Sequence, residues 1–315
     1  MPQVQTIAGP LDADQLGRTL IHEHLCVRAE SVVAQFPHLY DPEREHRQAV
    51  EAARTVMEHG VRTIADPAVM DLGRDVRLSS RVAEETGLQV VMSTGVYGQH
   101  YTFLPHHFQM HDVDYLADAL VHDIEEGIQG TSIKAGFLKC AVDEPGINED
   151  VEKVLRAVAR AHRRTGAPIM AHSHPATRRG LEIMDVLDEE GVDPSRVQIA
   201  HTGDTDDLDY IEELLGRGPY IGMDRYGLDM ILPTHRRNAT VVELAGRGYA
   251  DRMMLSQDAC AVFDWYPPEM VAEMAPNWNM TFIFDSVIPS LREAGVTEEQ
   301  VGSMLEEAPR RWLAG

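Results

Sequence analysis

Two histidines near the N-terminus are the residues of this sequence best suited to chemistry. His22 and His24 stand two positions apart in the strand-like run 19–25. On a β-strand this spacing places both imidazoles on one face and turns Glu23 the other way, toward the surrounding helices. Because neutral imidazole is a common metal ligand, the pair predicts a metal site at the end of a strand.

Other short apolar runs also end in residues that can bind metal, namely Lys139, His172, His201 and Asp258. Four imidazoles and one carboxylate suit Zn, Fe, Co or Mn. They are sufficient for two ions about 3.5–4 Å apart, provided that another group bridges the ions. The pattern therefore predicts a site for two metals.

Lys139 is the candidate for the bridging group, and it is one of three lysines among 28 basic residues. A buried lysine next to cations has a lowered pKa and becomes a neutral amine. A neutral amine can add CO₂ to form a carbamate, whose two oxygens could bridge two metals. Arginine cannot do this because its pKa stays above about 12. Lys134 precedes Lys139 by five residues, an odd offset that predicts the opposite strand face.

The order of the elements predicts an α/β protein, a single (β/α)8 TIM barrel domain over residues 1–315. Helical spacing is clearest over residues 148–164, and similar patterns cover 177–190 and 205–215. Alternation of short strands with helices is typical of parallel βαβ units, and a barrel collects its active-site residues at the strand ends. A doubly wound sheet is the alternative, but no GxGxxG motif is present. The eight expected strands are residues 19–25, 61–66, 88–95, 132–139, 168–172, 197–201, 220–224 and 253–258.

Composition narrows the class of partner. The formal net charge of -23 disfavours nucleic acid, because binding to phosphates needs a basic surface. Cys26, Cys140 and Cys260 form no CxxC pair, which argues against a disulfide framework and favours a reducing compartment. Without a signal peptide or a membrane-spanning run, the sequence predicts a cytoplasmic protein that does not bind membranes.

Two long connections interrupt the strand and helix pattern, at residues 98–112 and 260–279. Both are rich in aromatic residues, so we expect them to face the substrate or to form a subunit contact. The histidines that end no strand are expected in loops or at the surface: His106, His107, His111, His174 and His235.

With these motifs in place, the sequence resembles the phosphotriesterase family of the amidohydrolase superfamily, and most closely the phosphotriesterase-like lactonases. The resemblance extends from Gly9 to the C-terminus. Its motifs are LIHEH at 20–24, TGVY at 94–97, IKAGFLKC at 133–140, DEPG at 143–146, AHSH at 171–174, HTGD at 201–204, MDRYG at 223–227 and SQD at 256–258. One departure is Gln257, where the family usually has His; its side chain is expected to point away from Asp258 and to alter only the surroundings of the metals.

The resemblance also implies a role for each site residue. The more buried metal would be held by His22, His24 and Asp258, and the more exposed metal by His172 and His201. Carboxylated Lys139 and a hydroxide would bridge them. Tyr97 would lie over the metals near the substrate, and Trp265 would shape the leaving-group pocket. Arg225 and Asp204 match positions that orient substrate or relay protons, and a homodimer is implied as well.

The resulting hypothesis is a binuclear-metal hydrolase that opens lactones, such as N-acyl-homoserine or other γ- or δ-lactones. The bridging hydroxide would attack the carbonyl, and Asp258 would pass the proton onward through Asp204. Slow hydrolysis of organophosphate esters is the expected side activity. One alternative is a primary aryldialkylphosphatase. Another is a catalytically inactive metal-binding barrel, against which the complete ligand set argues.

Overall fold

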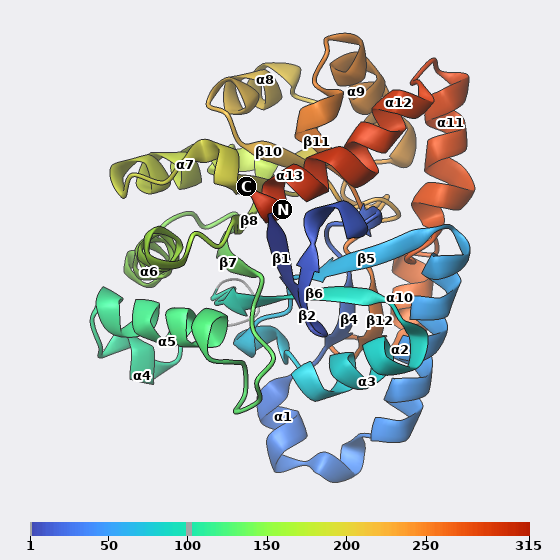
Figure 1. Ribbon diagram of the computed structural model, residues 1–315. Helices are drawn as coiled ribbons and strands as arrows, with labels where there is room; N and C mark the ends of the chain where they lie inside the picture. The colour runs from blue at the N-terminus through green and yellow to red at the C-terminus, as the bar shows by residue number, and fades with distance from the viewer. Residues whose placement is uncertain (1, 99–102) are drawn as a thin grey trace.

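The computed structural model of the protein describes residues 2–98 and 103–315. Parallel strands surrounded by helices form a single barrel domain, which confirms the predicted fold class (Figure 1). The wall follows chain order: β3 (Arg18–Leu20), β5 (Val61–Asp66), β6 (Gln89–Gly95), β7 (Phe137–Val142), β8 (Ile169–Ser173), β9 (Val197–Ala200), β10 (Tyr220–Met223) and β11 (Met253–Leu255).

The barrel closes at its carboxyl rim between the first and last strands. Strand β4 (His24–Val27) pairs there in parallel with β12 (Cys260–Phe263). The predicted strand 19–25 is therefore wrong in one respect, because it is broken at residues 21–23 into β3 and β4. The last predicted strand, 253–258, likewise ends at Leu255 and resumes at Cys260.

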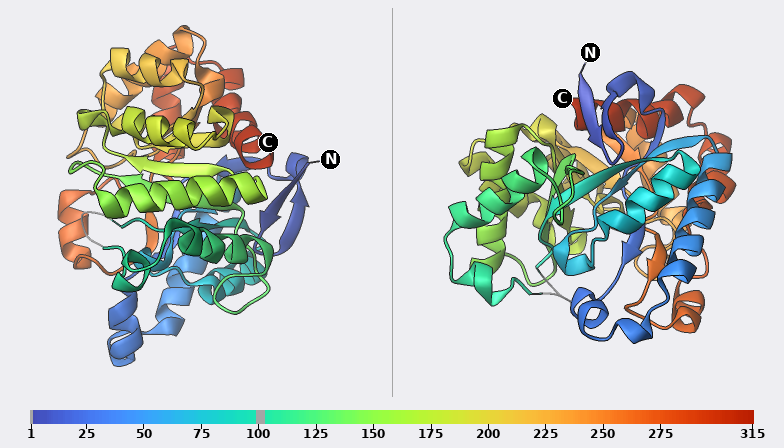
Figure 2. Two further views of the ribbon diagram at one scale, coloured as in Figure 1. Left: turned by 90° about the vertical axis from the view of Figure 1, so that its left-hand side faces the viewer. Right: turned by 60° about the horizontal axis from the view of Figure 1, so that its bottom comes forward.

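Helices form the outer layer around these strands, and the two chain termini lie side by side (Figure 2). The longer ones are α2 (Pro42–Glu58), α3 (Val76–Thr86), α5 (Val113–Glu125), α6 (Glu149–Thr165), α7 (Arg179–Glu189), α8 (Leu208–Gly216) and α9 (Thr234–Gly246). The shorter ones are α1 (Glu30–Gln35), α4 (His106–Gln109), α10 (Pro268–Met274), α11 (Ile288–Glu293), α12 (Glu298–Gly302) and α13 (Ala308–Ala314).

The clearest predicted helix is confirmed and shows why it begins and ends where it does. The Asn148 side chain accepts a hydrogen bond from the backbone N–H of Val151 and so caps α6, and Gly166 ends the helix in a left-handed conformation. Helices α7 and α8 begin two to three residues later than predicted. Arg178 is left-handed before α7, and Asp207 caps α8.

Strand β7 differs from the prediction at both ends. It was expected over residues 132–139 but runs over Phe137–Val142, because its pairing with β6 begins only at the Ser93–Phe137 pair. Lys139 therefore lies in the middle of the strand and not at its end. Lys134 lies in the connection before the strand, partly exposed, so its assignment to the opposite face of the same strand is wrong.

An apolar plug fills the barrel interior on the side opposite the rim. It includes Val91, Phe137 and Met170 from the strands and Ile21 from the break after β3. Trp312 of α13 packs on Phe137 with the ring centroids 5.5 Å apart. The amino-terminal hairpin of β1 (Gln3–Thr6) and β2 (Gly9–Asp12) contributes Val4 to the same cluster. The polar site thus stands on a densely packed apolar base.

Gly95, the last residue of β6, must be a glycine because the backbone of β7 at Lys139 lies against it. Gly95 has φ of +151°, and a Cβ there would lie 1.8 Å from the Lys139 carbonyl oxygen. We expect Gly95→Ala to lower the free energy of unfolding by about 3 kcal/mol or more, through strain and overpacking. Gly87→Ala is the control, since its φ of +80° is strained but no atom lies within 4 Å; it should cost about 1 kcal/mol. Equal losses in urea unfolding would contradict this explanation.

Candidate metal centre

The six predicted ligand residues line one cavity of about 430 Å³ at the carboxyl end of the barrel: His22, His24, Lys139, His172, His201 and Asp258. Asp258 is central among them. Its Oδ1 lies 3.3 Å from His22 Nε2 and 3.2 Å from His24 Nε2, and its Oδ2 lies 3.8 Å from His201 Nε2. The structure therefore brings together residues more than 230 positions apart, as the two-metal hypothesis requires.

The other imidazoles stand close to this group. The ring centroids of His22 and His201 are 4.8 Å apart, and those of His201 and His172 are 4.6 Å apart. Lys139 projects from β7 and is almost completely buried. Burial disfavours its charged ammonium and lowers the pKa of Lys139 to about 8. This shift favours the neutral amine that carbamate formation needs.

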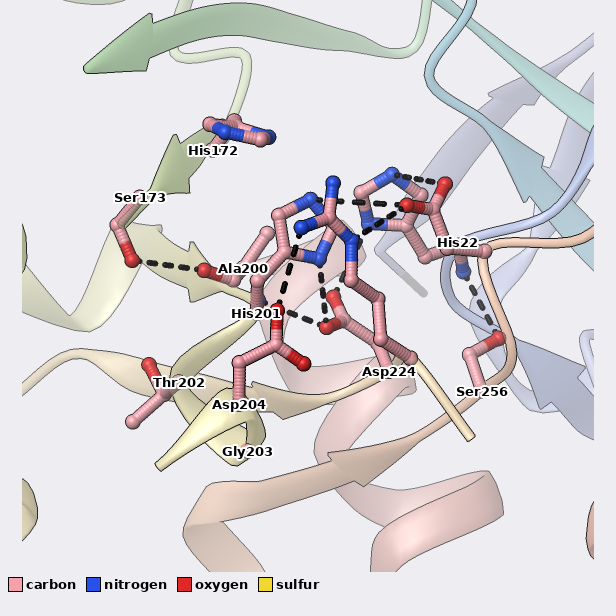
Figure 3. A network of polar contacts seen from close by, with 12 residues as sticks. His22, His172, Ser173, Ala200, His201, Thr202, Gly203, Asp204, Asp224 and Ser256 are labelled. Carbon is pink, nitrogen blue, oxygen red and sulfur yellow. Dashed lines mark hydrogen bonds and ion pairs between the residues drawn. The ribbon is translucent and has the colours of Figure 1, made fainter. Parts of the chain in front are cut away.

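A carboxylate that the sequence analysis missed orients two of the rings. Asp224 lies between His22 and His201, and each of its oxygens is 3.0 Å from the Nδ1 of one ring (Figure 3). It also accepts the backbone N–H of His201 at 2.7 Å. Because both oxygens are engaged in this way, we assign Asp224 to holding Nδ1 and leaving Nε2 of both rings for metal. A metal bound directly to Asp224 would have to displace these contacts.

Two further carboxylates lie beside the remaining histidines, one facing Nδ1 and the other facing Nε2. Asp66 Oδ1 lies 3.3 Å from His24 Nδ1, and Asp143 Oδ2 lies 3.6 Å from His172 Nε2. A signal for two of the three missed residues was present in the sequence. Asp66 and Asp224 are the last residues of predicted strands, just as His172 and His201 are.

The charges of the site favour cations. The carboxylates of Asp66, Asp224 and Asp258 are gathered around the imidazole rings, and their burial without compensating positive charge would be costly. Burial opposes ionisation of Asp258, but His22 and His24 outweigh it and hold the pKa of Asp258 well below its usual range. Burial similarly opposes the charged form of His24, yet Asp258 and Asp66 raise the pKa of His24 to about 9. The donor set and its excess of negative charge thus fit divalent metals.

Two of the predicted ligands sit in strained backbone. His201 has φ of 64° and Asp258 has φ of 55°, in the left-handed region that residues with a side chain rarely adopt. Such conformations persist only where surrounding contacts enforce them, and they concentrate at functional sites. His201 directly follows β9, and Asp258 lies in the break between β11 and β12, so both stand where the backbone turns at the rim.

The predicted substrate residues line the same cavity. The Tyr97 hydroxyl donates to Asp143 Oδ2 at 3.1 Å and lies 3.4 Å from His172 Nε2. Trp265 follows β12 and lines the cavity wall. The connection after Tyr97 includes residues 99–102, which lie outside the described residues.

An ionic chain continues from Asp258 away from the rings. Arg225 Nε donates to Asp258 Oδ2 at 2.9 Å, and Arg225 Nη1 donates to Asp204 Oδ2 at 3.2 Å. Arg237, a buried residue that the sequence analysis missed, donates to Asp204 Oδ1 at 2.5 Å. Asp204 is therefore held between two guanidinium groups.

Glu23 and Gln257 are chain neighbours of predicted ligands, and they differ in their hydrogen bonds. Glu23 was expected to face the helices, and this is wrong: its carboxylate hydrogen-bonds to the segment 256–259, because the break in the first strand turns it toward the last one. Gln257 is completely buried, and its amide has no hydrogen-bond partner among the described residues. It hydrogen-bonds to none of the predicted ligands, in line with an effect limited to their surroundings.

A parallel barrel with histidines, a lysine and carboxylates at its carboxyl end is the architecture of TIM-barrel enzymes. The phosphotriesterase family model matches residues 2–313, and the chain belongs to this family of hydrolases. An aryldialkylphosphatase from Saccharolobus solfataricus is 46% identical over 306 residues, which are 96% of this chain and 97% of the relative. A phosphotriesterase homology protein from Mycobacterium tuberculosis is 44% identical over 99% of this chain and 97% of its own length.

A solved structure agrees with this assignment. The phosphotriesterase from Mycobacterium tuberculosis superposes with a TM-score of 0.95 at 44% identity, and the match covers 99% of this chain and 98% of that one. Within residues 2–98 and 103–315, no helix is both long and apolar enough to cross a membrane.

We expect Asp224→Asn to weaken metal binding by about 10- to 100-fold, as for other partners of metal-binding histidines. An amide NH₂ facing one Nδ1 would force that ring into the tautomer that protonates Nε2. Asp207→Asn is the control, because asparagine caps a helix as well as aspartate does and α8 lies outside the cavity. The test is equilibrium dialysis followed by metal analysis. Unchanged affinity in Asp224→Asn would refute the orienting role.

The pKa of Lys139 predicts a pH dependence of stability in the metal-free, carbamate-free protein. Its pKa is about 8 in the folded chain and 10.5 for an unperturbed lysine, so between these values the unfolded chain binds the extra proton. Stability therefore rises with pH across this window, by on the order of 3 kcal/mol in total, and is flat below pH about 8. Lys139→Met should lack this rise when unfolding is measured at pH 7.5 and 9.5. A constant difference between the two proteins would contradict it.

Proposed function

We propose that the protein is a binuclear-metal hydrolase that opens lactones, N-acyl-homoserine or other γ- or δ-lactones among them. The observation that carries the proposal is the composition of the cavity, which joins a floor of metal-binding side chains to an apolar wall. Leu228 and Ile231 lie on that wall after β10, and Phe263 and Trp265 lie on it at and after the end of β12. An ester carbonyl with an attached alkyl or acyl chain matches this division.

The metals, two of Zn, Co, Fe or Mn, would be held as the resemblance implies. His22, His24 and Asp258 would bind one, His172 and His201 the other, and carboxylated Lys139 would bridge them. When bound, the pair would supply a water of lowered pKa and polarise the substrate carbonyl. The orientation of His22 and His201 by Asp224 supports this arrangement, because it turns both Nε2 atoms to one place.

Asp258 is the residue best placed to accept the proton of the attacking water and to return it to the alkoxide. A further relay through Arg225 to Asp204 is disfavoured. A guanidinium carries only donors, so it has no lone pair with which to accept a proton. Although burial opposes its charge, Asp204 and Asp258 raise the pKa of Arg225 further above its usual value. We therefore assign Arg225 and Asp204 to orienting Asp258 and the substrate.

Tyr97 supplies a neutral donor above His172. Burial and the adjacent Asp143 raise the pKa of Tyr97 well above its usual value, so the phenol keeps its proton. The hydroxyl, which donates to Asp143, can turn its proton to a lactone oxygen while the apolar wall holds the chain. Trp265 would set the room for that chain.

Two alternatives to a lactonase remain, and a comparison supports the first of them. Similarity to an aryldialkylphosphatase supports a phosphotriesterase reaction, which we assign to a slower side activity because P=O and C=O can be polarised at the same place. A binding protein without catalysis would also bind metal, but this chain retains all six predicted ligands in one cavity.

The homodimer and the cytoplasmic location are also part of the proposal. Phe36, Leu39, Phe103 and Met110 are exposed apolar residues, at 52%, 65%, 82% and 71% exposure, and they suit a subunit contact. Light scattering tests this proposal, and a monomeric mass at micromolar concentration would refute it. The three free cysteines suit a reducing compartment.

The decisive assay compares kcat/KM for γ- or δ-lactones with kcat/KM for paraoxon in the metal-loaded protein. We expect the lactone value to be at least about tenfold higher, a difference of roughly 1.4 kcal/mol in transition-state stabilisation. His22→Ala should lower lactone kcat/KM by about 10³-fold, because one metal loses a ligand. A higher value for paraoxon would favour the phosphotriesterase alternative, and two metals per chain without turnover of any ester would favour the inactive barrel.

A further inference from the structure

Residues 21–23 and 256–259 face each other where the first and last strands of the barrel meet, and we call this place the seam. It contains a carboxylate to which the proposed reaction assigns no role. Glu23 is completely buried. Its Oε1 accepts hydrogen bonds from Ser256 Oγ at 2.8 Å and from the backbone N–H of Gln257 at 2.7 Å. Its Oε2 accepts the backbone N–H of Ala259 at 2.9 Å. One side chain thus takes three donors from the short segment 256–259.

Asp258 lies between the two backbone amides that Glu23 binds. Its own N–H donates to the carbonyl oxygen of His22 at 3.0 Å. The N–H groups of three successive residues, 257–259, are therefore all bound by residues 22 and 23. This matters because Asp258 is left-handed, a conformation that costs a residue with a side chain roughly 1–2 kcal/mol and needs external support.

Ser256 connects these hydrogen bonds to the backbone of His22. Its hydroxyl donates to Glu23 and accepts the backbone N–H of His22 at 3.1 Å. The backbone N–H of His24 donates to the carbonyl oxygen of Ala259 at 2.9 Å. The two histidines and Asp258 are consequently fixed to one another through backbone contacts centred on Glu23.

We propose that Glu23 is a positioning residue of the metal centre, whose buried carboxylate holds the left-handed turn that presents Asp258 to His22 and His24. The inference rests on the proposed metal centre. A side chain with two acceptor oxygens fits this place, because Oε1 accepts two of the three hydrogen bonds and Oε2 accepts the third. If Glu23 served only to close the barrel, its loss would lower stability without a selective effect on one metal.

Glu23→Gln tests the proposal by placing an NH₂ group against at least one of these donors. We expect the affinity for one of the two metals to fall by about 10- to 100-fold and the other affinity to stay near that of the parent. Glu23→Asp keeps both carboxyl oxygens but is one methylene too short to reach both amides, so it should show the same selective loss. Chelator competition with metal analysis measures both affinities, and lactone kcat should fall with little change in KM.

Two controls separate positioning from general stability. Thr63→Val removes a buried hydrogen bond, from Thr63 Oγ1 to the Leu16 carbonyl oxygen at 2.7 Å, on a strand that bears no predicted ligand, and should keep both affinities. Ser256→Ala leaves the bonds from Glu23 to the two amides in place, so it should fold and show a smaller selective loss.

Parent affinities for both metals in the Glu23 variants would overturn the proposal. If those variants do not fold, Ser256→Ala decides, and a result equal to that of Thr63→Val would overturn it. A parent protein that binds fewer than two metals would instead overturn the proposed metal centre, and this inference with it.

Discussion

The closure of the barrel between its first and last strands is the constraint on which the site depends. Strands β3 and β11 end short of the rim, and pairing resumes only between β4 and β12. His22 and Asp258 stand in the two breaks, where the backbone is free of regular pairing and can turn side chains into the cavity. Cross-seam hydrogen bonds replace the missing ladder, so the backbone groups of this irregular segment stay satisfied.

Compensation of buried charge is the second physical theme. Aspartates stand behind the histidines, and the apolar plug below excludes water from the other side. Such a group of carboxylates is costly to bury unless cations share the space. The same arrangement that orients the imidazoles therefore favours the binding of divalent ions, and it makes the orientation of each ring depend on a partner outside the immediate ligand set.

The cavity has two parts, the predicted ligands at its floor and an apolar wall. The predicted ligands stand on the barrel strands or directly beside their ends, whereas the connections after β10 and β12 carry the apolar wall. Asp204 links the two parts, because Arg225 joins it to Asp258 and Arg237 joins it to the carbonyl oxygens at 203, 228 and 232. Changes in the wall can thus alter substrate preference while the metal-binding residues stay in place.

Sequence alone determined the barrel class and the set of predicted metal-binding residues, since both depend on local periodicity and on residue type at strand ends. It failed where contacts span the chain. The partners of Asp224 are 202 and 23 positions away, and no local pattern encodes such a meeting. Glu23 was misplaced because the period of two holds only along an unbroken strand, and the break at residues 21–23 follows from closing the barrel. Only the tertiary structure decided that Lys139 lies in mid-strand, that Asp258 is left-handed and which nitrogens of His22 and His201 remain available, because packing against distant strands sets each of these.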